Sequence, residues 1–229
     1  LLNANENTDN FRRAYAIVVM AGSKGTTAPP VVDNSVEFDS SVTALKLNTA
    51  LEKNNVKVVE SWTADGNLDI PAGKTLTVNG NLNMGTYGIT FGKDAKLVVN
   101  GELKIGKSLG AFANVKADSL TVTDTCTFGG TVNVAGALTV AANETLTVTG
   151  TVYAGSVSGN TTGTIHVKST NSLHVAGNAT AVTIISGNNN AGENGYVSIK
   201  GVLDANAKFE DRNVATSAVA TLVQEIDEV

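Results

Sequence analysis

The best candidate for metal binding in the sequence is a short acidic string made by Asp65, Asn67 and Asp69. A D-x-N-x-D spacing opens the calcium loop of an EF-hand, because carboxylate and amide oxygens are the hard ligands that calcium prefers. The rest of the loop is missing, since Ile70 and Leu76 stand where it needs Gly at the sixth position and Glu at the twelfth. The string therefore favours a polar strand edge, with Asn67 and Asp69 pointing to solvent, over a calcium site.

The two histidines and the single cysteine are the other candidates for metal or nucleophilic chemistry. His166 and His174 each lie between two apolar residues, so on a strand both side chains point outward. Zinc needs further ligands, and no cysteine or acid stands near either histidine in the sequence. Cys126 shares its parity with Val122 and Phe128, which predicts a small buried core residue rather than a reactive thiol. One cysteine excludes an internal disulfide, and we expect no metal and no cofactor.

Three Asn-x-Ser/Thr sequons, which begin at Asn143, Asn160 and Asn178, are candidate glycosylation sites. They would matter only in a secreted, glycosylating setting. The chain holds 25 Asn and 28 Thr, so chance alone accounts for this number of sequons.

The composition excludes several classes of function. The chain has 21 acidic and 16 basic residues, a net charge of −5 and only three arginines, so a basic nucleic-acid-binding surface is not expected. The longest apolar run, residues 14–21, is too short for a membrane helix, which needs about 20 residues. A hydrophobic content of 42% argues against disorder. Because the chain begins at Leu1, we expect a processed product.

Internal repetition dominates the sequence. A pattern of Gly-x-apolar-x-apolar begins at Gly66, Gly80, Gly101, Gly130, Gly136, Gly150 and Gly163, with a weaker copy at Gly201. Gly177 ends a related segment, Ser-Leu-His-Val-Ala-Gly. For the glycines at 66, 80, 101, 136, 150, 163 and 177, the successive differences in sequence number are 14, 21, 35, 14, 13 and 14, nearly all multiples of seven. Strict alternation of apolar and polar residues indicates strands with one buried face.

A strand of about five residues plus a two-residue turn makes a seven-residue side, and three sides make a coil of about 21 residues. Stacked coils predict a mainly β fold, a parallel β-solenoid (β-helix). The competing fold is an antiparallel sandwich or barrel, whose turns do not usually return at a fixed period. The predicted inward-facing residues of the solenoid are Leu76, Val78, Leu97, Val99, Leu146 and Val148, and Thr147 is predicted to face outward.

The two ends of the chain differ from the repeats. We predict an N-terminal arm and small α/β cap over residues 1–63, solenoid repeats over 64–205, and a C-terminal cap over 206–229. The N-terminal cap is expected to hold a helix that begins after Asp39, Ser40 or Ser41 and includes Val42 and Leu45 on its apolar face. Apolar residues at helical spacing near the C-terminus predict a short amphipathic helix over 217–228.

The outward positions of the repeats hold little chemistry. Aligned repeats predict one outward column of Asp69, Asn83, Lys104, Asn133, Tyr153 and His166. Asp69 and Glu102 are separated by a coil that carries two asparagines, so the alignment places no two carboxylates opposite each other as glycoside hydrolysis requires. The sequence also lacks a phosphate-binding loop and a nucleophile elbow, and we expect no catalytic residues.

The repeats, for example the segment Pro71 to Gly80, resemble the β-solenoid stretches of bacterial and archaeal cell-surface proteins. Those families include adhesins, surface-layer components and filament-forming proteins, and there is a weaker resemblance to bactofilins, the cytoskeletal solenoids that polymerise end to end. The resemblance covers roughly residues 64–205. It implies an extracellular, cell-surface location and a partner that is another copy of the same chain. The high Asn and Thr content also favours an extracellular location.

We therefore expect a non-enzymatic structural subunit that self-assembles into a filament, sheath or surface layer. The alternative is a carbohydrate-binding or carbohydrate-cleaving solenoid, which would recognise cell-surface glycans. An apolar strand near the N-terminus is the predicted assembly interface, and it either adds to a sheet edge of a neighbouring subunit or folds back onto its own chain. This strand consists of Ala14, Tyr15, Ala16, Ile17, Val18, Val19 and Met20.

Overall fold

The computed structural model describes residues 35–168, 170–190, 193–213 and 222–224. The chain divides into two units, residues 1–34 and residues 35–229, and the described residues belong to the second. The predicted assembly strand of residues 14–20 lies outside the described residues.

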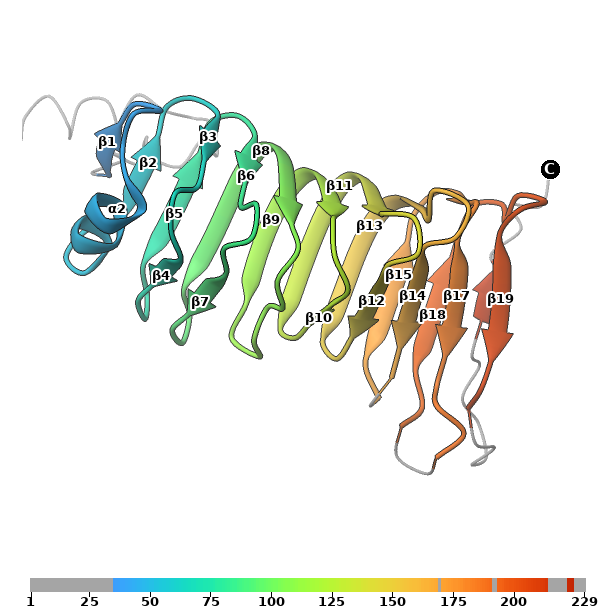
Figure 1. Ribbon diagram of the computed structural model, residues 1–229. Coiled ribbons are helices and arrows are strands. Elements are labelled where there is room, and N and C mark those ends of the chain that lie inside the picture. The colour runs from blue at the N-terminus through green and yellow to red at the C-terminus, as the bar shows by residue number, and fades with distance from the viewer. Residues whose placement is uncertain (1–34, 169, 191–192, 214–221, 225–229) are drawn as a thin grey trace, which may run out of the picture. The chain divides into compact units, whose positions relative to one another are not determined.

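Residues 35–213 form a parallel β-solenoid of about eight coils, as the repeats predict. Figure 1 shows the coils following one another from the blue to the red end of the described chain, and every pairing between described strands is parallel. The largest sheet contains β1 (Val36–Phe38), β2 (Val56–Val58), β3 (Trp62–Thr63), β5 (Thr75–Val78), β6 (Leu82–Asn83), β8 (Lys96–Ile105), β9 (Asn114–Val122), β11 (Thr131–Val140), β13 (Thr151–Ser158), β15 (Ser172–Val175), β16 (Ala179–Thr180), β18 (Tyr196–Ile199) and β20 (Leu222–Gln224). A second sheet contains β10 (Cys126–Phe128), β12 (Thr145–Val148), β14 (Thr164–Val167), β17 (Thr183–Ser186) and β19 (Lys208–Asp211), and a third pairs β4 (Leu68–Ile70) with β7 (Ile89–Phe91).

Each coil has three sides, which we call the first, second and third side in chain order. In the fourth coil, Leu97 to Val99 lie on the first side and Leu103 to Ile105 on the second. The long strands β8, β9, β11 and β13 run through the corner between these two sides, and their registers shift there. The third side is formed by β4 and β7, and in later coils by the second sheet.

The coils are less uniform in length than the predicted repeat. In sequence numbering, the register advances by 20 from Val56 to Leu76 and by 21 from Leu76 to Leu97. It advances by only 18 from Leu97 to Val115, and by 24 from Leu173 to Val197. The sides keep their alternation while the corners absorb the difference in length.

Apolar and polar residues alternate along each side, and the inward-facing apolar residues form one continuous core. All six residues predicted to face inward are buried, with at most 1% of their surface exposed. Cys126 is buried as predicted, and Thr147 is half-buried on the outward face between Thr127 and His166. Burial of a leucine or valine side chain contributes about 1.5–3 kcal/mol, so the core supplies the main driving force for stacking the coils.

Polar side chains at the corners take over the hydrogen bonding between coils where the backbone pairing of the strands ends. Asn, Ser and Thr residues outside the strands accept the backbone N–H of a residue in the next coil at 2.9 to 3.1 Å. These pairs are Asn55 with Thr75, Ser61 with Asn81, Asn67 with Gly88, Asn81 with Glu102, Ser108 with Thr127, Thr125 with Thr145, and Asn178 with Val202. A buried or half-buried N–H needs such a partner, so part of the Asn and Thr content has a structural cause.

Close approach of neighbouring coils makes some corner glycines irreplaceable. Gly150 is buried and adopts an ordinary φ, yet a Cβ at this position would stand 2.6 Å from the Gly130 nitrogen and closer still to its carbonyl oxygen. The constraint is therefore the backbone of the preceding coil and not the conformation of Gly150 itself.

The N-terminal helix begins later than predicted. Helix α2 (Ala44–Leu51) has Thr43 as its N-cap, and the Thr43 side chain accepts the Lys46 N–H. Asp39 instead holds a turn, because its carboxylate accepts the backbone N–H and the hydroxyl of Ser41.

The later start rotates the buried face of α2. Ala44, Leu47 and Leu51 are buried, whereas Leu45, predicted on the apolar face, is 78% exposed. Figure 1 shows α2 at the blue end of the solenoid. It packs against β4 and so takes the place of a third-side strand in the first coil.

Asn48 on α2 closes the edge of β4 as a strand would. Its amide nitrogen donates to the Asn67 carbonyl at 2.9 Å, and its Oδ1 accepts the Asp69 N–H at 2.9 Å. One side chain thus satisfies both a donor and an acceptor at an otherwise open sheet edge.

The solenoid extends past both predicted repeat boundaries. β1 and β2 belong to the largest sheet, so the α/β cap before residue 64 forms the first coil and the beginning of the second. Beyond residue 205, β19 extends the second sheet. The predicted C-terminal helix is wrong where it is described, because Leu222–Gln224 form strand β20, which pairs with β18. At these three residues, backbone pairing with the edge of β18 takes precedence over the helical spacing of the apolar residues. The rest of 217–228 lies outside the described residues.

No helix among the described residues is long and apolar enough to cross a membrane.

Candidate functional site

The acidic string that begins at Asp65 serves structural hydrogen bonds. Asp65 Oδ1 accepts the Ala44 N–H at 2.7 Å, at the start of α2. Asn67 Oδ1 accepts a backbone N–H of the next coil, and Asp69 Oδ1 accepts the Thr90 hydroxyl at 2.6 Å. Asn67 and Asp69 are not buried, as predicted for a polar strand edge.

The structure does not bring the two histidines together. Both occupy half-buried outward positions between buried neighbours, but His166 lies on the third side and His174 on the first. His166 Nε2 lies 2.8 Å from the Gly187 carbonyl oxygen, which holds the ring by a hydrogen bond to Nε2–H. Within the described part of the chain, no group of three or more His, Cys, Asp or Glu residues is placed to hold a metal ion.

The two acids considered for catalysis also lie apart. Asp69 is on the third side in β4, whereas Glu102 is at the corner between the first and second sides in β8. Glu102 accepts the Thr121 hydroxyl at 2.7 Å and lies 3.5 Å from the Lys104 ammonium. Each carboxylate is therefore engaged with neighbours on its own side of the coil.

The sequons occupy accessible positions. Asn143 and Asn160 are exposed turn residues with φ of 65° and 48°. Asn178 is also exposed, and its Oδ1 accepts the Val202 N–H at 2.9 Å. A glycan on Asn178 would have to preserve this contact between coils.

The most distinctive surface feature is a row of three aromatic rings on the first side. Tyr153 and His174 stand on adjacent coils with ring centroids 4.9 Å apart and planes 14° from parallel. Tyr196 lies one coil further on, with its ring centroid 5.5 Å from that of His174 and its plane tilted by 47°. Stacking of this kind stabilises adjacent strands, and Tyr153 remains 45% exposed.

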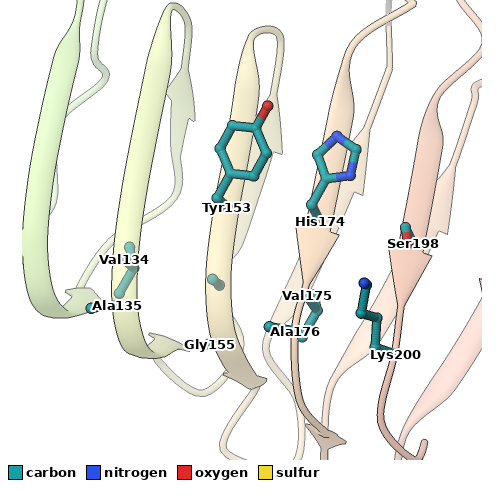
Figure 2. A pocket seen from close by; sticks show the side chains of 10 residues that line it. Val134, Ala135, Tyr153, Gly155, His174, Val175, Ala176, Ser198 and Lys200 are labelled. Carbon is teal, nitrogen blue, oxygen red and sulfur yellow. The ribbon is translucent and has the colours of Figure 1, made fainter. Parts of the chain in front are cut away.

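A cavity of about 410 Å³ lies beside the aromatic row, at the corner between the first and second sides. Figure 2 shows Tyr153 and His174 on neighbouring strands along one part of the cavity, with Lys200 and Ser198 on the next strand. We call this the corner cavity, and its lining runs along the successive coils from β11 to β18.

The floor of the corner cavity is made of small residues. Ala135, Gly155 and Ala176 come from three successive coils. A Cβ on Gly155 would lie 2.9 Å from the Gly136 carbonyl oxygen and closer still to that of Ala135, so only glycine fits there. The absence of larger side chains at this corner is what hollows the surface.

The described residues that line the corner cavity have a mixed electrostatic character, and none of them is an acid. Lys200 supplies a positive charge, and Ser198 and Tyr153 supply hydroxyl groups that can donate or accept. Burial lowers the pKa of His174, which favours the neutral imidazole. The described lining thus combines an apolar surface with polar groups.

A second, smaller hollow of about 270 Å³ lies at the same corner in the second to fourth coils. Its lining is polar and includes Ser61, Asn81 and the Glu102–Lys104 ion pair. Ser61 and Asn81 already accept backbone N–H groups of the next coil, so the polar groups of this hollow serve the solenoid itself.

Sequence reasoning missed the aromatic row because it aligned the wrong repeats. The predicted column sets His166 beside Tyr153, but the observed neighbour of Tyr153 is His174, one whole coil further along the chain. The repeats at Gly150 and Gly163 lie on different sides of one coil. Comparing positions one whole coil apart would have shown Thr-Val-Tyr and Ser-Leu-His in register.

Comparisons with protein-family models, with curated proteins and with solved structures gave no match to this chain.

Proposed function

We propose that this β-solenoid is a non-enzymatic structural subunit that self-assembles outside the cell into a filament, sheath or surface layer. In the proposal, subunits join by β-sheet contacts, in which the strand of residues 14–20 adds to a sheet edge of a neighbour. The observation that carries the proposal is the asymmetric N-terminal end of the solenoid, which α2 closes on the third side but not on the first.

The open element at this end is β1. Val36 donates its N–H to the Asn55 carbonyl, and the Phe38 carbonyl accepts the Val59 N–H, so both residues turn their backbone groups toward β2. Glu37, between them, therefore turns its N–H and C=O away from β2. Among the described residues no strand pairs with this outer edge, and an unpaired edge is a template for another chain.

The first test removes residues 1–22 from the chain. If the arm connects subunits, assembly seen by light scattering and negative-stain microscopy is lost, while the far-ultraviolet circular dichroism keeps its β signature. A deletion of residues 1–10 is the matched control, because it shortens the arm and leaves the apolar strand intact. Loss of the β signature in the longer deletion would instead assign the strand to its own subunit, and normal assembly would exclude the arm as a connector.

The second test blocks the β1 edge with one residue. Glu37→Pro removes the outward N–H without removing a β1–β2 hydrogen bond. Glu37→Thr is the control, because it keeps the N–H and loses only the exposed ion pair with Lys57, whose Nζ lies 2.9 Å from the Glu37 carboxylate. We expect the proline variant alone to stop assembly while remaining monomeric and folded; equal assembly of both variants would show that β1 is not a contact.

The carbohydrate-binding alternative is supported by one observation, the corner cavity with its aromatic wall. Cleavage of a polysaccharide has no comparable support, because Asp69 and Glu102 lie on different sides of the coil.

A further inference from the structure

We propose that the N-terminal end of the solenoid holds a receptor site for the arm of a second copy, and that the arm binds there antiparallel to β1. The inference rests on the proposed function, because the occupant is the same apolar strand of residues 14–20. It adds the direction of that strand, the side chain that anchors it and the charges that select it. The site itself consists of described residues of β1, of the turn after β1 and of α2.

The apolar core is open at the β1 edge. Val36 and Phe38 stand in register with Val56 and Val58, which are fully buried, so their side chains face the core. No described strand precedes β1 in the sheet, and Val36 is 36% exposed while Phe38 is only partly buried. A strand added to this edge would therefore place every second side chain over the open end of the core.

A cavity of about 420 Å³ lies beside this edge, between β1 and the start of α2. We call it the end pocket. Its apolar lining comes from Phe38 and Val42, and its polar lining from Glu37, Asp39, Ser41, Thr43 and Lys46. Lys46 Nζ lies 5.3 Å from the centroid of the Phe38 ring. A cation beside an apolar surface favours an aromatic occupant, and Tyr15 is the only aromatic residue in the strand of residues 14–20.

The alternation of the strand gives its register. One face carries Tyr15, Ile17 and Val19, and the other carries Ala14, Ala16, Val18 and Met20. The first face covers the open core better, because two of the four residues on the other face are alanine. Tyr15 reaches the end pocket when it stands opposite Phe38. Ala16 then lies opposite Glu37, whose N–H and C=O face away from β2 and can pair with an added strand.

The charges after β1 select the antiparallel direction. Arg12 and Arg13 come directly before the strand, and in this direction they reach the turn that follows β1. Asp39 and Glu60 lie at this turn, and each engages one carboxylate oxygen with a serine of the turn. A guanidinium has five donors and can bind the second oxygen of such a carboxylate. Lys46 offsets only one of the two acids.

The parallel direction would bring the same arginines to the corner before β1. The Val36 N–H donates to the Asn55 carbonyl, which places the residues just before Asn55 beside the start of β1. Among the described residues, two lysines meet there, since Lys74 Nζ donates to the Lys53 carbonyl oxygen at 2.8 Å, and Glu52 is the neighbouring acid. Like charges brought together oppose binding, so this corner is the poorer partner for two arginines.

Disulfide cross-linking tests the direction of the strand. With Ala16 opposite Glu37, an antiparallel strand brings Val18 opposite Ser35, whereas a parallel strand brings Ala14 opposite Ser35. Opposed residues of a hydrogen-bonded pair have Cα atoms about 5.5 Å apart, within the range of a disulfide. We mix Val18→Cys chains with Ser35→Cys chains before assembly and expect at least about ten times more intermolecular disulfide than from Ala14→Cys chains mixed with Ser35→Cys chains. Each single variant alone measures the background.

Charge reversal tests the acidic turn without an added cysteine. Arg13→Glu should raise the protein concentration needed for assembly at least about tenfold, and Glu60→Lys in the same chain should lower it again. Lys24→Glu is the matched control, because it makes the same change of charge on the other side of the strand and should alter that concentration by less than about twofold. Tyr15→Ala should weaken assembly as much as Arg13→Glu does, and Val18→Ala, on the opposite face, should not.

The outcomes separate this site from the proposed function, once circular dichroism confirms that each variant is folded. If deletion of residues 1–22 stops assembly, but cross-linking is equal, reversed or absent, or Arg13→Glu assembles normally, the receptor site is overturned and the arm remains the connector. If assembly survives the deletion, the proposed contact fails and the site fails with it. A chain with both Val18→Cys and Ser35→Cys should give a ladder of cross-linked species. Dimers alone would keep the site and exclude a polymer, and a disulfide confined to single chains would assign the arm to its own solenoid.

Discussion

Replacing Gly150 by alanine tests how the coils of this solenoid are held together. The added methyl group would meet the backbone of Gly130 in the preceding coil, at 2.6 Å from its nitrogen. Backbone atoms cannot turn aside as a flexible side chain can, so the two coils must separate locally. The hydrogen bond most affected is the one from the Thr151 N–H to the Gly130 carbonyl oxygen, which is 2.8 Å long.

The expected cost follows from two contributions. Overpacking a tight interior position costs about 1–3 kcal/mol, and weakening a backbone hydrogen bond adds roughly 1 kcal/mol. Gly150→Ala should therefore lower the free energy of unfolding by about 2–4 kcal/mol, a large share of the roughly 5–15 kcal/mol that stabilises an ordinary domain.

Gly110→Ala is the control for this experiment. Gly110 is exposed, has an ordinary φ, and would place a Cβ with nothing within 4 Å. Alanine restricts the unfolded chain there without a clash, so we expect no loss and a gain of up to about 1 kcal/mol. Urea denaturation followed by circular dichroism measures both variants. Equal stability of the two would refute the argument that close contact between coils, rather than backbone conformation, demands glycine at 150.

Three further predictions concern the core and the titrating groups. Leu146→Ala should cost about 2–5 kcal/mol of unfolding free energy, whereas Thr147→Lys on the outward face should change it by no more than about 0.5 kcal/mol; the reverse order in urea denaturation would place the register one residue off. Burial raises the pKa of the Cys126 thiol to about 12, so iodoacetamide at pH 8 should label this residue only after denaturation, and rapid labelling of the native protein would contradict its burial. Burial lowers the pKa of His174 below its usual 6.5, so the unfolded chain binds a proton at this residue before the folded chain does as the pH falls through about 6.5. The free energy of unfolding should therefore decline toward acidic pH, and His174→Gln should flatten that part of the pH–stability profile. An unchanged slope in the variant would assign the decline to other groups.

The sides of the solenoid could be predicted from sequence because burial imposes a strict period of two. Leu146 and Val148 are inward since any other register would expose the apolar face. The corners carry no comparable period, and coils whose register advances by anything from 17 to 25 positions break any fixed alignment. For that reason sequence alignment pairs Tyr153 with His166, and it gives no sign of the cavity beside His174.

The ends of the solenoid were harder to predict because local and tertiary preferences compete there. Thr43 and Ser41 are both good N-caps, and packing of Leu47 and Leu51 into the first coil decides between them. Leu222–Gln224 carry a helical spacing of apolar residues, yet β18 offers them a strand partner. Neither outcome has a signal in the sequence alone, since each depends on which surface the preceding coil leaves open.

The amide of Asn48 also bears on the geometry of any assembly that grows from this end. A stack of three-sided coils would, by itself, accept a neighbour in three nearly equivalent orientations about its axis. Because Asn48 already occupies the donor and acceptor positions at the β4 edge, a neighbour rotated so as to pair on that side finds no hydrogen-bonding partner. In the proposed polymer, this single side chain on a short helix would restrict the rotation of one subunit about the solenoid axis relative to the next, and hence the helical pitch.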